Sequence, residues 1–389
     1  MSAHANPDII DDGLVFLYDT DDGKSYKGEP TTNLFPSPQL DNNTNTTVGE
    51  ASITLKNFGS DLVGLEMIQA ATSNIVTFSM GSLSSAVSGG AYTWSSYVNS
   101  TSIGHKVKAQ VTVRVDGVRY WLTNSNTWAT SPTECTHLFA PTIANEWHRV
   151  DTQFTMPTGT LTEFQLGGWY RSTSNFTLRV ANAQLELKSH ATPFVNGARS
   201  STQGLLDRTG NTTIDVSNAS FDSNAQMTFD GTDDYIDLGN LGLGSGSFTV
   251  EAVIYPPLAS TYHVFFRKGD DSNSNANMDW SMGYDYDQFH VRTQNASVSI
   301  NEYAGGSFVN NYGHVALTYD GSTIIMYLNG SEVSNKTVTL ANNYSNYSIG
   351  RGINNYAQLD VKTLKVYNQT LTAAEVLQNF NAIKSRFGL

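Results

Sequence analysis

Aromatic residues stand beside asparagine, aspartate or glutamine in two groups of the sequence, and this combination can bind sugars. Sugars present flat apolar C–H faces that stack on exposed rings, while amides and carboxylates hydrogen-bond the hydroxyls. The first group is Tyr120, Trp121, Asn124, Asn126 and Trp128, and the second is Asp279, Trp280, Tyr284, Asp285, Tyr286 and Gln288. Because a tryptophan at strand spacing also suits a protein core, each group has a purely structural alternative. Both are candidate carbohydrate sites.

A run of aspartates offers a candidate calcium site. Calcium prefers hard oxygen ligands, and Asp230, Asp233 and Asp234 place three carboxylates in one short turn, with Asp237 close behind. The alternative is that Asp230-Gly231 is a turn and that the other aspartates accept hydrogen bonds from loop amides. The sequence favours this alternative, because no further calcium ligands can be identified. No other cofactor is expected.

Composition and charge narrow the function classes. The chain has 389 residues, which is too long for one β-sandwich and suits two domains. Only 15% of residues are charged, and polar loop residues are common, as in all-β proteins. The net charge of -13 and the lack of a Lys/Arg cluster argue against a nucleic-acid partner.

The sequence shows no sign of disulfides, zinc sites or membrane spans. Cys135 is the only cysteine, and no Cys/His spacing resembles a zinc site. The first residues lack the basic and apolar regions of a signal peptide, and no run is long enough to span a bilayer. We therefore expect synthesis in a cytoplasm without export, and no membrane insertion.

Two tight turns organise the second half of the chain. Asp320-Gly321 and Asn329-Gly330 close apolar runs and predict a meander of three antiparallel strands. Residues 313–330 resemble the signature of laminin-G/concanavalin A-like lectin domains, and so do residues 227–239. The resemblance implies two facing sheets and a domain that binds more often than it cuts.

The chain lacks the catalytic motif of this fold's hydrolase relatives. They carry paired acids on one strand, as Glu-x-Asp-x-x-Glu or a close variant, and no such motif is present. Glu251 and Glu302 are isolated acids that could meet in space as an acid/base pair. The histidines form no recognisable nucleophilic constellation with serine and aspartate. We expect no enzymatic activity, and a glycan hydrolase is the weaker alternative.

The first half of the chain predicts a second all-β domain. Short β runs recur at the spacing of a sandwich or jelly roll, over residues 53–58, 91–98, 106–115, 118–122, 147–154 and 176–187. Residues 146–157 and 178–194 resemble jelly-roll carbohydrate-binding modules that recur in phage and bacterial surface proteins. The expected fold is all-β, with two β-sandwich or jelly-roll domains and a short C-terminal helix.

That helix is predicted from the capping box of residues 372–375 to Gly388. Leu377, Phe380 and Ile383 recur at helical spacing and are the predicted inner face. This ending strongly resembles the tails of lectin-like structural proteins of large tailed phages. The resemblance implies that the chain belongs to a virion.

We expect the lectin-like domain to be discontinuous. Residues 13–32 resemble its opening, but the expected continuation, residues 206–211, follows only after the module. This places a lectin domain at 13–32 and 203–389, with an inserted module at 33–202. Leu14–Tyr18 should then pair beside Leu359–Tyr367. The alternative is two domains in series, with residues 13–18 as an edge strand of the module.

Together these features predict a non-enzymatic structural protein of a tailed-phage virion. It would decorate the head or form part of a fibre or tail appendage, in several copies or as a homo-oligomer, with other virion proteins as partners. Its lectin-like domains would meet host or environmental glycans weakly and many times over. A receptor-binding adhesin proper is the alternative. Residues 1–12, polar and interrupted by proline, are the predicted attachment arm.

Overall fold

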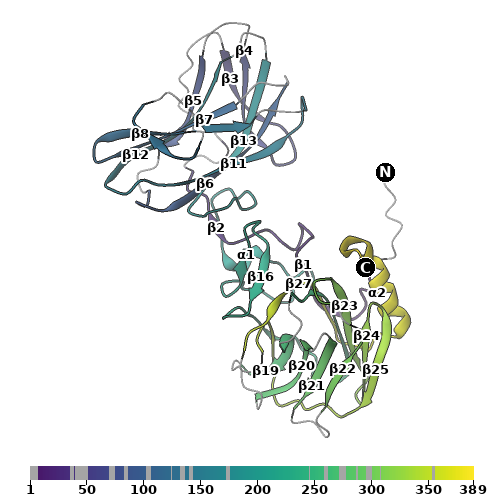
Figure 1. The fold of residues 1–389 in the computed structure, drawn as a ribbon. Helices are drawn as coiled ribbons and strands as arrows, with labels where there is room; N and C mark the ends of the chain where they lie inside the picture. The colour runs from purple at the N-terminus through teal and green to yellow at the C-terminus, as the bar shows by residue number, and fades with distance from the viewer. Residues whose placement is uncertain are drawn as a thin grey trace. The chain divides into compact units, whose positions relative to one another are not determined.

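The chain forms two compact units in the computed structural model (Figure 1). Unit 1 comprises Met1–Pro30, Ser200–Asp222 and Gln226–Leu389, and unit 2 comprises Thr31–Arg199 and Ser223–Ala225. Both are built mainly of β-strands, which confirms the predicted all-β fold class. The structure describes residues 8–35, 39, 51–69, 75–82, 86–101, 107–123, 125–131, 136–139, 143–171, 176–244, 246–257, 262–270, 277–285, 288–294, 300–306, 308–352 and 355–389.

Unit 1 contains an eight-stranded antiparallel sheet. Its strands run in the order β15-β16-β27-β18-β23-β24-β25, and β1 also pairs with β27. Their bounds are β1 (Leu14–Asp19), β15 (Ser220–Phe221), β16 (Met227–Asp230), β18 (Phe248–Tyr255), β23 (Gly313–Tyr319), β24 (Thr323–Leu328), β25 (Ser331–Thr337) and β27 (Gln358–Tyr367).

A six-stranded sheet faces it across the core of unit 1. The order is β17-β26-β19-β20-β21-β22, with bounds β17 (Ile236–Asn240), β19 (His263–Gly269), β20 (Met278–Asp285), β21 (Gln288–Thr293), β22 (Asn301–Ala304) and β26 (Asn346–Ile349). Phe248 of β18 stacks on Trp280 of β20, with ring centroids 4.9 Å apart. Apolar residues that alternate along both sheets therefore close into one sandwich core.

The pairing predicted for the first strand is confirmed. Phe16 lies opposite Val366, and Tyr18 lies opposite Leu364. The Tyr18 hydroxyl donates to the carbonyl of Val361 at 3.2 Å, and both aromatic side chains are fully buried. β1 is therefore a strand of the unit 1 sheet, and the alternative of an edge strand in the module is wrong.

The predicted meander is also confirmed as β23, β24 and β25. Its second turn has Asn329 and Gly330 at φ 50° and 76°. Two consecutive positive φ values are typical of the hairpin turn that an Asn-Gly dipeptide adopts most readily. Local turn chemistry therefore sets the register of this half of the sheet.

Unit 2 is a second sandwich. A five-stranded sheet runs β11-β6-β13-β4-β3, and a six-stranded one runs β5-β12-β7-β8-β9 with β10 on β7. Trp94 of β6 and Val113 of β7 meet in its core. The bounds are β3 (Ala51–Asn57), β4 (Val63–Gln69), β5 (Ile75–Ser82), β6 (Ala91–Ser100), β7 (Val107–Val115), β8 (Val118–Leu122), β9 (Trp128–Ala129), β10 (Thr136–Phe139), β11 (His148–Thr155), β12 (Leu161–Arg171) and β13 (Phe176–Glu186).

The two ends of unit 2 lie next to each other. Strands β2 (Thr31–Thr32) and β14 (Ala198–Arg199) form a two-stranded ribbon, in which Ala198 faces Thr32. Just outside it, Lys27 donates its backbone N–H to the carbonyl of Gly204 at 2.8 Å. Neighbouring ends are what an inserted domain requires, so this arrangement suits the insertion hypothesis.

Helix α2 (Ala373–Phe387) begins with the predicted capping box and ends at Gly388, which has φ 68°. The predicted inner face is only partly right. Ile383 is buried, but Phe380 is half-buried and Leu377 is 44% exposed. The buried face consists of Val376, Asn379, Ile383 and Phe387, because Asn379 finds polar partners beneath the helix. Neither α2 nor α1 (Ser201–Gly204), the helices in the described part of the chain, is long and apolar enough to cross a membrane.

Only the last residues of the predicted arm, from Asp8 on, belong to the described residues, and these pack on unit 1. The backbone N–H of Ile10 donates to Asn379 Oδ1 at 2.7 Å, and the Tyr367 hydroxyl donates to the carbonyl of Ile10 at 3.0 Å. Gln378 donates to the carbonyl of Asp8 at 2.8 Å. Residues 8–12 therefore lie against α2 and β27, which supply hydrogen-bond partners for their backbone. The attachment role of the arm stays a prediction.

Candidate functional site

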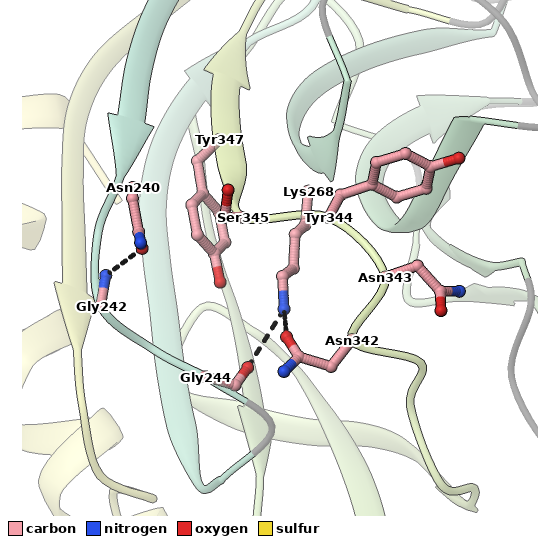
Figure 2. Close-up of a pocket in the computed structure, with 9 residues that line it drawn as sticks. All are labelled: Asn240, Gly242, Gly244, Lys268, Asn342, Asn343, Tyr344, Ser345 and Tyr347. Carbon is pink, nitrogen blue, oxygen red and sulfur yellow. Dashed lines mark hydrogen bonds between the residues drawn. The ribbon is translucent and has the colours of Figure 1, made fainter.

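A pocket of about 350 Å³ opens in unit 1 near the ends of β17 and β26 (Figure 2). Its lining residues are mostly small or amide-bearing, and they include one cation and no carboxylate. They are Asn240, Gly242, Gly244, Lys268, Asn342, Asn343, Tyr344, Ser345 and Tyr347. Groups of this kind hydrogen-bond neutral hydroxyls well.

One wall of the pocket is the loop that follows β17. Leu241 and Leu243 are buried, whereas Gly242 and Gly244 alternate with them at φ 74° and 59°. The Asn240 side chain accepts a hydrogen bond from the backbone N–H of Gly242 at 2.8 Å. The leucines anchor the loop in the core, and the left-handed glycines turn its backbone toward the pocket.

The opposite wall is the segment before β26. Asp279 of β20 is fully buried, and its carboxylate accepts from the backbone N–H groups of Asn343 at 3.0 Å and Tyr344 at 3.1 Å. The side chains of Asn342 and Ser345 remain exposed. A buried carboxylate therefore fixes the backbone of this wall and leaves its polar side chains available to a ligand.

Lys268 of β19 connects the two walls. Its ammonium donates to the carbonyl of Gly244 at 3.1 Å and to Asn342 Oδ1, as Figure 2 shows. The nearest oxygen of Asp279 lies 3.8 Å away. Burial lowers the pKa of Lys268 below its ordinary value, and the charge of Asp279 opposes that lowering.

The Tyr347 ring lies beside the lysine and is only 2% exposed. Its ring packs against Phe266, with centroids 5.8 Å apart, and the Lys268 ammonium lies 5.8 Å from the ring centre. Burial raises the pKa of the Tyr347 hydroxyl well above its ordinary value, so the hydroxyl keeps its proton as a hydrogen-bond donor. The ring is thus held rigidly by the core.

The second predicted aromatic group, from Asp279 to Gln288 in unit 1, does not form a platform. Trp280 and Tyr284 are at most 1% exposed, which contradicts the prediction that they stack on sugars. Both point into the core because inward residues alternate along β20. Asp285 is buried and accepts from the Tyr303 hydroxyl at 3.2 Å. Tyr286 lies outside the described residues.

The first predicted group, from Tyr120 to Trp128 in unit 2, is divided between two faces. Trp128 lies opposite Leu122, whereas Trp121 lies opposite Ala129, so the two indoles point to opposite sides of the sheet. Trp128 also donates to the carbonyl of Thr155 at 2.7 Å. These tryptophans cannot form one platform, and Asn124 lies outside the described residues.

The predicted calcium turn brings its three carboxylates together, with ligand atoms of Asp230, Asp233 and Asp234 within 4.8 Å of one another. Asp234 is buried, and its oxygens accept from the Asp230 backbone N–H at 2.6 Å and the Ser220 hydroxyl at 3.0 Å. Burial raises the pKa of Asp234 above its ordinary value. This geometry favours the loop-capping alternative, and calcium binding stays a prediction.

Glu251 and Glu302 are each held by other partners. Glu251 lies on β18 in the eight-stranded sheet, where Lys365 donates to it at 3.2 Å. Glu302 lies on β22 in the facing sheet and accepts from the Ser334 hydroxyl at 2.6 Å. The structure gives this pair of acids no shared site.

No direct signal in the sequence marks the pocket, because three distant segments build it. Asn342-Asn343 between two strands was the visible hint, since exposed amides commonly mark polar binding loops. Lys268 was a second hint, as a lysine near the end of the apolar run Val264–Phe266. Neither hint identifies a partner segment, so only the folded arrangement reveals the site.

Residues 230–377 match the family described as the concanavalin A-like lectin/glucanases superfamily. No curated protein matches the chain significantly. Among solved structures, the binding domain of Paraclostridial Mosquitocidal Protein 1 is 16% identical with a TM-score of 0.36, over 46% of this chain and 49% of that one. The chain thus spans about half the length of that toxin domain.

Two sialidase structures are also similar. Trypanosoma rangeli sialidase is 13% identical with a TM-score of 0.38, over 85% of this chain and 62% of that one. The CBM40 of Ruminococcus gnavus IT-sialidase, solved with alpha2,3 sialyllactose, is 11% identical with a TM-score of 0.30, over 35% and 82% of the two chains. The family match and the two facing sheets establish that unit 1 of this chain contains a concanavalin A-like domain.

Proposed function

We propose that this chain is a non-enzymatic glycan-binding protein and that its concanavalin A-like domain binds carbohydrate in the pocket of Figure 2. The observation that carries the proposal is the lining itself. Exposed Asn342 and Ser345 lie opposite Asn240. Amide and hydroxyl groups of this kind match sugar hydroxyls.

Filling the pocket tests this function. Ser345→Trp places a bulky side chain at an exposed lining position, and Ser331→Trp places the same side chain at an exposed position on β25. On a glycan array, the unaltered protein should bind a defined set of glycans. Ser345→Trp should lose that binding and Ser331→Trp should keep it. Equal binding by both variants would exclude this pocket.

Glu251 and Glu302 each have their own partners, which supports a role in binding without catalysis. Incubation of bound glycans with the protein should therefore release no new reducing ends. If the unaltered protein released reducing ends and Glu302→Gln did not, the protein would instead be a hydrolase. If no glycan on the array is bound, a purely structural role of the lectin-like domain would be favoured.

The proposed setting is the surface of a tailed-phage virion, on the head, a fibre or a tail appendage. This part rests on the sequence of residues 371–388, which resembles the tails of lectin-like virion proteins. Many weakly binding copies on one particle would give useful avidity. Mass spectrometry and antibody labelling of purified particles test it, and absence of the chain from particles would contradict it.

A further inference from the structure

Building on the proposed function, we infer that the pocket prefers a sugar with an anionic substituent, which Lys268 recognises. Among the described residues that line the pocket, Lys268 is the only charged one. Its carboxylate partner Asp279 is fully buried and is not part of the lining. Lys268 is itself only 2% exposed, so a ligand reaches its ammonium only in place of the Asn342 side chain that contacts it.

Asp279 is also committed to the protein backbone. It accepts from the N–H groups of Asn343 and Tyr344 at 3.0 and 3.1 Å, whereas the Lys268 ammonium lies 3.8 Å from its nearest oxygen. The carboxylate thus has two backbone N–H donors closer to it than the ammonium. The ammonium keeps capacity for a closer, charge-assisted hydrogen bond with another anion.

The ammonium has one contact that a ligand can replace. Gly244 accepts through a backbone carbonyl that the loop fixes, but Asn342 accepts through the amide of an exposed side chain. Exchange of that amide for a carboxylate or sulfate oxygen turns a neutral acceptor into an ionised one. Little rearrangement is needed beyond one side-chain rotation.

Long-range electrostatics do not favour anions here. The chain carries a net charge of -13, which repels anionic ligands in general. Preference for an anionic sugar must therefore arise inside the pocket, at Lys268. A local effect of this kind depends on single residues, so it can be removed by one substitution.

Asn342→Asp and Asn343→Asp form a matched pair for this test. Both residues line the pocket and are exposed, and both substitutions add one negative charge. Only residue 342 contacts the Lys268 ammonium through its side chain, and Figure 2 shows the Asn343 side chain turned away from it. Asn342→Asp gives Lys268 an internal carboxylate that competes with the ligand.

Titration calorimetry at constant salt should compare charged sugars with neutral partners. The probes are an oligogalacturonide with its methyl ester, and a sulfated galactan with its desulfated form. The unaltered protein should bind at least one charged form about tenfold more tightly than its neutral partner. Asn342→Asp should abolish this preference, and Asn343→Asp should reduce it by less. The two probe pairs show which anionic group is recognised.

Lys268→Met provides a second, independent variant, with its melting temperature measured first because Asp279 loses a partner. If it folds, it should bind the neutral sugars and lose the preference for charged ones. Equal affinity of the unaltered protein for charged and neutral sugars would overturn the inference and leave the proposed function intact. Failure to bind any sugar would contradict both.

Discussion

Glu251 is the side chain that most clearly links burial to charge in this protein. It lies under α2 with 1% exposure, and it accepts from Lys365 at 3.2 Å and from Asn379 at 2.9 Å. Burial alone raises the pKa of Glu251, but Lys365, His314 and Asn379 together hold it below its ordinary value of 4.5. The carboxylate is therefore ionised at neutral pH.

We predict that Glu251→Gln lowers the free energy of unfolding by about 3 to 5 kcal/mol, because it leaves Lys365 buried without its anion. The double variant Glu251→Gln with Lys365→Met should recover part of this loss. Urea denaturation at pH 7 measures both. A single variant as stable as the unaltered protein would show that the ion pair contributes nothing.

The same carboxylate predicts a pH dependence. A group whose pKa is lower in the folded state stabilises the fold above its unfolded value and loses that contribution as pH falls through the folded value. The unaltered protein should therefore lose the stability from Glu251 as pH falls below about 4.5. Over that pH range, the difference in free energy of unfolding between the unaltered protein and Glu251→Gln should become smaller.

Among the elements, α2 shows what local sequence can and cannot predict. The capping box and Gly388 fix the ends of the helix, because caps depend on residues within one turn. The buried face of α2 was harder to predict from the sequence, because Asn379 points inward to Glu251 and Tyr367, which are distant in the chain. Turn dipeptides and strand runs likewise predicted the sheets. The pocket was not predictable, because its walls are brought together only by strand pairing.

We predict that Ile383→Ala lowers the free energy of unfolding by about 2 to 5 kcal/mol, as for other buried aliphatic residues. Ile383 packs with Val253 and Phe387 in a small apolar cluster between α2 and the sheet. Leu377→Ala is the control on the same helix, because Leu377 is 44% exposed. Its effect should stay within about 0.5 kcal/mol. If Ile383→Ala and Leu377→Ala lost the same stability in thermal denaturation, the observed inner face of α2 would be contradicted.

For the molecule as a whole, the two units have separate apolar cores that consist of different residues. The apolar cluster of unit 1 draws on Phe16 and Val366, and that of unit 2 draws on Trp94 and Val113. Each unit buries its own apolar side chains between its own sheets. Independent cores are what allow a domain to fold by itself.

We predict that unit 1 folds without unit 2. Residues 33–197 are replaced by Asn-Gly, so that Thr32 and Ala198, which already face each other, form a hairpin. The shortened protein should melt cooperatively in calorimetry and retain glycan binding. Deletion of residues 8–30 from the same protein is the control. This deletion removes β1 from β27 and should prevent folding. If the shortened protein that keeps residues 8–30 were insoluble, unit 1 would depend on unit 2.

The partnership of β1 with β27 also has a consequence for synthesis on the ribosome. Tyr18 and Val361, which share a hydrogen bond, are 343 residues apart in the chain. At translation rates of about 5 to 20 residues per second, β1 waits roughly 20 to 70 s for its partner. During that interval all of unit 2 emerges and can fold. β1 thus leaves the ribosome before the other described strands of this chain but is among the last of them to find its place, and its apolar residues need protection in the meantime.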